Sequence, residues 1–288
     1  MASETISIEE ELGNVERLNV SDIADRTTPI KVFLFLCASV AIFFVFLIIL
    51  FLFYQGGSFF VDYQLTLQAS SPTGRGQDEL FGSSFIIWGT ILVALGALVI
   101  AIPLGLGMAI FIAEIAPPKM RNILKAAVEI LSGIPSVVYG YFGRVILKEW
   151  IEEIFNIPLG LNWLNASLLL AIMALPTIVS VCEDAITAVP RHYREASYAM
   201  GATKWHTIRK VVIPAGMSGI SAGIILGMGR AIGETMAVTM VGGGNIVFPD
   251  PIADVFSGLR TITATIALEL KEAVGLHVQA LFALGIVL

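Results

Sequence analysis

Long stretches without a charged residue dominate the chain and predict membrane-spanning helices. Residues 32–54 form the first of these stretches and residues 81–113 the second. A helix rises about 1.5 Å per residue, so about 20 apolar residues cross the hydrocarbon core of a bilayer. Residues 32–54 follow an acidic leader and exceed the apolar length of a signal peptide, so we interpret them as a retained span.

The same criterion predicts an all-α helical bundle of six spans, at residues 32–54, 85–113, 123–147, 166–189, 211–240 and from 277 onwards. The second must tilt, kink at Pro103 or begin outside the membrane, and the fourth contains Pro176. The sixth, from His277 to Leu288, gives about 18 Å of helix against a core of roughly 30 Å. A chain end in hydrocarbon would leave carbonyls without partners, so we expect the last span to be truncated here.

Lysine and arginine residues predict the orientation, because they collect in cytoplasmic loops. Eleven of the 17 fall on the side of the N-terminus and of the 191–210 loop. We therefore expect both to face the cytoplasm, and residues 55–84, 148–165 and 241–275 to face outward.

Composition supports a membrane protein and locates the negative charge. The chain is 56% apolar and 14% charged, with a mean hydropathy of +0.85, whereas soluble domains are about a quarter charged. Residues 1–28 hold seven acids and two bases, which accounts for five of the six net negative charges. We interpret 1–30 as a disordered acidic cytoplasmic tail, 31–84 as the first span with an outward loop, and 85–288 as the core. A basic surface for nucleic acid is absent from this pattern.

The basic segment between the fourth and fifth spans predicts two short helices. Residues 191–200 can form the first, which Gly201 ends by accepting a positive φ. Thr203 is a candidate N-cap of the second. Tyr198 and Trp205 offer apolar area for docking. The alternative is a solvated loop held at the lipid headgroups by its basic residues.

The spacing of this segment resembles the EAA loop of ABC-importer permeases: Glu-Ala-Ala, three residues, Gly, nine residues, Ile, one residue, Leu-Pro. The matching positions are Glu195-Ala196-Ser197, Gly201, Val211, Ile213 and Pro214, with small or apolar exchanges at three of them. In that family the loop sits in a cleft of the cytoplasmic ATPase. The resemblance implies that contact with the ATPase is made by Glu195, Ala196, Gly201, Ala202 and Trp205.

Four further motifs resemble the phosphate (Pst) family of these permeases, most closely its PstC subunits. They are Ile134–Gly140, Leu175–Ala185, the run GMGRAIGETMAV at Gly227–Val238, and Arg260–Glu269. The resemblance extends from about residue 85 to the end. It implies the type I ABC-importer permease fold, a prokaryotic inner-membrane location, and the role of a phosphate-transport subunit rather than an enzyme. The implied partners are a second, PstA-like permease subunit, two PstB-like ATPase subunits and an external PstS-like phosphate-binding protein.

Two ionisable residues at membrane depth, Arg230 and Glu234, are four positions apart and predict one shared helix face. They either form a packing salt bridge or line an anion path, since the guanidinium fork matches phosphate oxygens. Glu234 would then keep the anion from binding too tightly to leave. We assign to this path Arg230, Glu234, Thr235, Arg260, Thr261 and Thr263. For the last three the alternative is a solvated outward loop.

Other chemistry is not indicated by the sequence. The motifs GxxxxGK[ST], GxSxG, HExxH and CxxC do not occur, so we expect no catalytic residues and no cofactor here, with ATP-Mg bound by the partner ATPase. The three histidines lack metal-ligand spacing. Glu183 and Asp184 are expected to pair with Arg191 or Arg194. The open alternatives are a permease for molybdate or sulfate, a secondary transporter or channel without an ATPase, and a sensor scaffold that does not transport.

Overall fold

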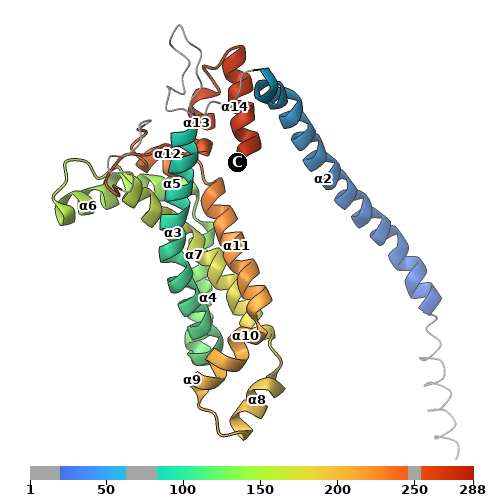
Figure 1. Cartoon of the computed structure of the whole chain (residues 1–288). Helices are drawn as coiled ribbons and strands as arrows, with labels where there is room; N and C mark the ends of the chain where they lie inside the picture. Colours follow the sequence, from blue (N-terminus) through green and yellow to red (C-terminus); the bar gives the residue numbers. More distant parts are fainter. Residues whose placement is uncertain (1–19, 63–82, 246–253) are drawn as a thin grey trace, which may run out of the picture.

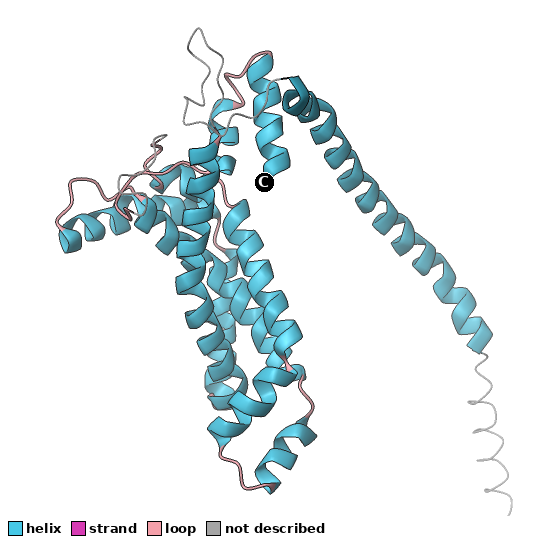
Figure 2. Cartoon of the chain, in the orientation of Figure 1, coloured by secondary structure: helices cyan, strands magenta, loops and turns pink. Residues whose placement is uncertain are grey.

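The computed structural model describes residues 20–62, 83–245 and 254–288. Within these ranges the secondary structure is helical and contains no strand (Figure 2). The elements, with η marking π-helical turns, are α2 (Val20–Asp62), α3 (Ser84–Ile110), η1 (Phe111–Ile115), α4 (Pro118–Gly133), α5 (Ser136–Phe142), η2 (Gly143–Leu147), α6 (Lys148–Phe155), α7 (Trp163–Ala188), α8 (Arg191–Ala199), α9 (Lys204–Thr207), η3 (Ile208–Val212), α10 (Ile213–Ala215), α11 (Met217–Gly233), α12 (Met236–Val241), α13 (Ile262–Glu269) and α14 (Leu276–Val287).

Helix α7 is the centre of the bundle and packs between α3 and α11 (Figure 1). Its Ile178 is fully buried and lies against Gly105 of α3 and Gly227 of α11, where a Cβ atom would collide with the isoleucine side chain. Small residues at such contacts let membrane helices approach closely, which favours their association where no water is available to drive it. The predicted second and fourth spans, at 85–113 and 166–189, are thus confirmed as α3 with η1 and as α7.

The predicted third span, 123–147, is wrong as a single straight helix. Helix α4 ends at Gly133, and the helical segment Ser136–Phe155 continues at 91° to it. Pro135 has no N–H and forces Ile134 into an extended conformation, which breaks the helix. The carbonyl of Leu131 accepts a hydrogen bond from the Tyr139 hydroxyl at 2.9 Å. The expected outward loop 148–165 begins with helix α6.

The predicted fifth span, 211–240, is also interrupted, at two places. The first is a 73° bend at Gly216, just after Pro214, between the segment Lys204–Ala215 and helix α11. The second follows Gly233, where Glu234 has the extended dihedrals φ −73° and ψ 127° before α12 begins. The expected single helix is therefore three pieces with different directions.

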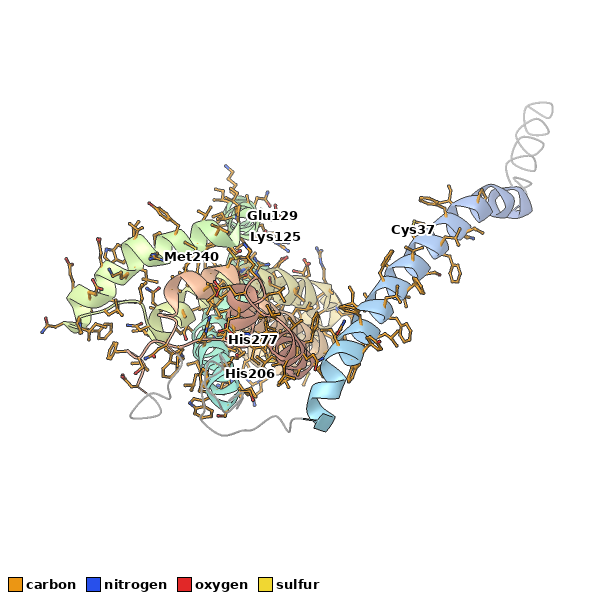
Figure 3. The ribbon with its side chains drawn as sticks, turned by 90° about the horizontal axis from the view of Figure 1, so that it is seen from above. Cys37, Lys125, Glu129, His206, Met240 and His277 are labelled. Carbon is orange, nitrogen blue, oxygen red and sulfur yellow. The ribbon has the colours of Figure 1, made fainter. Side chains whose placement is uncertain are left out.

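Helix α2 contains the predicted first span and lies apart from the bundle over most of its length (Figure 3). It contacts α14 near its C-terminal end, where the rings of Phe51 and Phe282 are 5.5 Å apart and edge-on. The helix begins at Val20, so the end of the expected disordered tail 1–30 is helical. Residues 1–19 of that tail, and residues 63–82 of the expected outward loop 55–84, lie outside the described residues.

By length and composition, three of the described helices can cross a membrane, and the two bent pairs raise the number of spans to five. Helix α14 is a shorter apolar helix at the position of the predicted sixth span. The start of α2 lies at the same end of the molecule as α8 and α9, while α6, α12 and α13 lie at the other end (Figure 1). The bundle therefore has two opposite ends, one of which carries the 191–210 loop.

Candidate functional site

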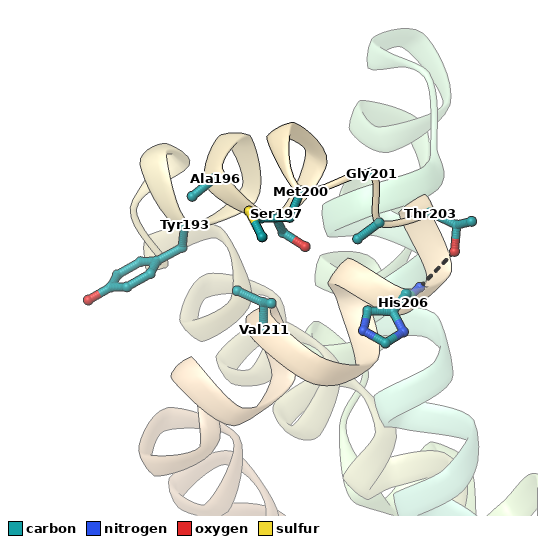
Figure 4. A pocket seen from close by; sticks show the side chains of 9 residues that line it. Tyr193, Ala196, Ser197, Met200, Gly201, Thr203, His206 and Val211 are labelled. Atoms are coloured by element: carbon teal, nitrogen blue, oxygen red, sulfur yellow. Dashed lines mark hydrogen bonds between the residues drawn. The ribbon is translucent and has the colours of Figure 1, made fainter.

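The 191–210 loop forms the two short helices that the sequence predicts. Helix α8 ends where Gly201 adopts a φ of +80°, and the N–H groups of Gly201 and Ala202 donate to the carbonyls of Tyr198 and Ser197. This is the Schellman arrangement, which favours glycine at the left-handed position. Thr203 caps the second helix by accepting a hydrogen bond from the His206 N–H at 3.3 Å (Figure 4).

The two helices flank an open hollow, and large apolar side chains are exposed on the same loop. The hydroxyls of Ser197 and Thr207 are 2.8 Å apart and join α8 to the segment that follows. A cavity of about 660 Å³ lies between the helices (Figure 4). Met200 is 88% exposed and Trp205 61% exposed at this end of the molecule. Exposed large apolar side chains in one place are typical of a protein-docking surface.

The residues assigned to ATPase contact lie together on this loop. Glu195, Ala196, Gly201 and Trp205 are exposed and Ala202 is half-buried. Ala196, Gly201 and Ala202 line the cavity between the helices.

The ion pairs behind the loop differ from the expected ones. Glu183 does not pair with Arg191 or Arg194: its carboxylate contacts Arg121 Nη2 and Lys125 Nζ of α4, each at 2.5 Å. Asp184 lies 3.9 Å from Lys125. Arg194 instead binds Glu114 of η1, with an N–O distance of 2.6 Å. The partners of Glu183 and Arg194 are 62 and 80 residues away in the chain, so sequence proximity could not identify them.

Arg230 and Glu234 do not share a helix face, because α11 ends between them at Gly233. The Arg230 Nε donates to the carbonyl of Met173 in α7 at 3.0 Å. The Glu234 carboxylate accepts from the N–H of Ala237 at 3.4 Å, at the start of α12. The alternative of a packing salt bridge is therefore not found, and each side chain contacts the backbone instead.

The path residues around α13 are mostly buried, which contradicts the alternative of a solvated loop. Thr261 caps α13, and the Thr263 hydroxyl donates to the Glu234 carbonyl at 3.0 Å. Arg260 Nη1 binds Glu269 Oε1 at 2.7 Å, and the other oxygen of Glu269 lies 3.0 Å from His277 Nε2. The structure therefore brings the segment after α11 and the start of α13 together. Glu269, which is not among the path residues predicted from the sequence, is the counter-ion of Arg260.

Thr235 is half-buried in the same break, and its backbone carbonyl accepts from the Thr239 hydroxyl at 2.7 Å. Thr235 occupies the N-cap position of α12 without a capping hydrogen bond from its side chain. The predicted path residues fall into two groups, one on α11 at Arg230 and one where α12 and α13 begin.

The chain is similar to known transport proteins over most of its length. Residues 101–288 match the family described as binding-protein-dependent transport system inner membrane component. The phosphate transport system permease protein PstC of Mesorhizobium japonicum is 39% identical over 230 residues, which cover 73% of this chain and 69% of that protein. The protein of the same name from Pasteurella multocida is 38% identical over 229 residues, covering 73% and 71%.

Two further likenesses agree with these. The probable ABC transporter permease protein YqgH of Bacillus subtilis is 42% identical over 185 residues, covering 64% of this chain and 60% of that protein. A solved structure of the MetNI methionine ABC transporter in an inward-facing conformation has a TM-score of 0.54 at 20% identity, covering 69% of this chain and 86% of that chain. At that identity the likeness shows a shared fold.

Proposed function

The chain belongs to the family of binding-protein-dependent transport system inner membrane components, and within it to the PstC phosphate transport permeases; from this premise we propose that it is the membrane subunit of an ATP-driven phosphate importer. It forms one half of the translocation path and does not itself hydrolyse ATP. The phosphate specificity is supported by the relatives and by the motifs around Arg230 and Arg260.

The observation that carries the proposal is the 191–210 loop. It is a compact helical projection at one end of the bundle, held by a glycine cap and exposing Met200 and Trp205. Such a surface suits docking to another protein. The 288 residues contain no P-loop sequence, and the relatives are permease proteins, so the proposal assigns ATP hydrolysis to a partner chain.

The path for the anion follows from the polar groups at membrane depth. Arg230 uses its Nε to bind the Met173 carbonyl, which fixes the plane of the guanidinium. An arginine fork offers parallel N–H donors that match phosphate oxygens. Glu234, Thr235, Thr261 and Thr263 lie at the second group of the path. The Arg260–Glu269 pair supplies a cation whose charge is already balanced.

The assembly that fits this chain is a heteromeric complex. A second, PstA-like permease subunit completes the path, two PstB-like ATPases dock on the 191–210 loops, and an external PstS-like protein delivers phosphate. The N-terminus and the loop face the cytoplasm. ATP binding draws the ATPases together and moves the loops, the spans tilt to open the path outward, and hydrolysis restores the inward-facing state.

Co-purification tests the proposal directly. The protein is extracted from its own membranes in mild detergent, and the accompanying chains are identified by mass spectrometry. We expect a P-loop ATPase and a second permease-like chain. A lone chain or homo-oligomer without an ATPase would contradict the importer class and favour a secondary transporter or channel.

The anion is tested on the reconstituted complex. We expect ATP-dependent uptake of labelled phosphate that excess molybdate or sulfate does not reduce. Efficient competition by either oxyanion would assign the chain to that substrate instead.

A further inference from the structure

One arginine connects the 191–210 loop to two spans. Arg194 lies in α8, and its Nε and Nη2 donate to the same carboxylate oxygen of Glu114 in η1, at 2.9 and 2.6 Å. Its Nη1 donates to the carbonyl of Val189 at 2.6 Å, and Nη2 also donates to that of Ile186 at 2.9 Å. A single guanidinium therefore joins the loop to the end of α3 with η1 and to the end of α7.

These contacts are shielded from solvent, so they are strong. The Arg194 side chain is 16% exposed and that of Glu114 is 8% exposed. Hydrogen bonds between charged groups are about twice as strong as neutral ones, and the planar fork of arginine loses little freedom when it forms several. The last carbonyls of a helix lack partners within it and form the negative end of its dipole, which favours a cation there.

The neighbouring ion pairs extend the connection to a third element. Glu183 lies one turn before Ile186 in α7 and pairs with Arg121 and Lys125 of α4. The ends of η1, α4 and α7 are thus held together directly behind α8. The other exit from the loop differs: the chain bends by 73° at Gly216 before α11 begins.

The two sides of α8 have different environments. Arg194 is turned toward the bundle and is largely buried, whereas the next residue, Glu195, is exposed. A partner that contacts the exposed side would therefore displace an element whose opposite side is bound to η1 and α7.

We propose that Arg194 is the positioning residue that transmits movement of the 191–210 loop to the ends of α3 and α7. The loop and these span ends move as one body, and the bend at Gly216 absorbs the change relative to α11. The inference rests on the proposed function, because it supposes that an ATPase displaces the loop.

The test uses the complete complex, purified with its ATPases and reconstituted into vesicles. The variants are Arg194→Gln and Glu114→Gln, with Arg144→Gln as the control, since Arg144 is an exposed arginine outside the 191–210 loop. The ATPase content, the rate of ATP hydrolysis and the phosphate taken up per ATP are measured. The last ratio reports transmission, which a role in folding alone would not change.

We expect the Arg194→Gln complex to retain its ATPases and their rate of ATP hydrolysis. Its phosphate uptake per ATP should fall about tenfold or more, which is the size of effect that a typical coupling free energy between two sites produces. Glu114→Gln loses less, because Arg194 keeps its contacts with the α7 carbonyls. Arg144→Gln behaves as the unaltered complex. Normal uptake per ATP in Arg194→Gln would overturn the proposal.

The remaining outcomes also decide the matter. Loss of the ATPases from an otherwise intact Arg194→Gln chain would assign Arg194 to docking and overturn transmission. If that chain does not assemble, Arg194→Lys provides the same measurement, because one ammonium cannot reach all the acceptors; normal coupling in it would overturn the proposal. An unaltered complex without an ATPase would refute the proposed function itself, and transmission with it.

Discussion

At the scale of the residue, Arg230 shows how a backbone contact directs a charged side chain. Its Nε is held by the Met173 carbonyl, so the rest of the guanidinium is left for a ligand. Arg230→Ala removes this cation, and since the residue is exposed on α11 we expect assembly to persist while phosphate uptake falls to background. Uptake of labelled phosphate is measured at matched complex levels, with the exposed Arg144→Ala as control. Uptake at the unaltered rate in a well-expressed Arg230→Ala strain would refute the role.

Residue contacts within one turn follow from the sequence, whereas distant ones do not. The cap at Gly201 and the hydrogen bond to Thr203 depend on neighbours a few positions away, so both are predicted and confirmed. The partners of Arg194 and Glu183 depend on how α4, η1 and α7 pack. Several cations near a carboxylate are equivalent in sequence, and helix packing alone decides which one reaches it.

At the scale of the element, the turn between α8 and α9 depends on the backbone conformation of Gly201. Its φ of +80° costs other residues roughly 1–2 kcal/mol, with asparagine the best tolerated. No atom lies within 4 Å of a Cβ built there, so the cost comes from the conformation and not from a clash. We expect Gly201→Val to uncouple or dissociate the ATPase and Gly201→Asn to retain it, measured by co-purification and by uptake per ATP. Equal behaviour of the two variants would contradict a conformational role.

The helix breaks set the limit of prediction for elements. Uncharged stretches locate the spans, because a helix that crosses the hydrocarbon core must be apolar. Such a stretch does not predict where the helix bends. Pro135 interrupts the third span, yet Pro103 and Pro176 lie within continuous helices. Proline permits a break, and the surrounding packing decides whether it occurs. The prediction that Arg230 and Glu234 share one helix face is wrong for the same reason, since α11 ends between them.

At the scale of the whole molecule, the fold class is predictable and the arrangement is not. Six apolar regions and a basic loop indicate a helical membrane bundle, and the order of the elements follows directly. The course of α2 away from the bundle could not be inferred, because its long apolar sides contact little of this chain. A helix that is apolar all round fits lipid as well as another subunit, so its sequence does not specify one neighbour.

The two opposite ends of the bundle make its orientation testable. Lysine and arginine are concentrated at the end with the 191–210 loop, so that end is expected in the cytoplasm. One cysteine is introduced at a time, at Met200, 88% exposed on the loop, or at Leu159, 50% exposed at the opposite end, in a Cys37→Ser background where the remaining Cys182 is buried. In intact cells a membrane-impermeant maleimide should label Leu159→Cys. It should label Met200→Cys only after the membrane has been permeabilised. The reverse pattern would place the loop outside, where a cytoplasmic ATPase could not reach it, and would refute the coupling role of the loop and the direction of transport together.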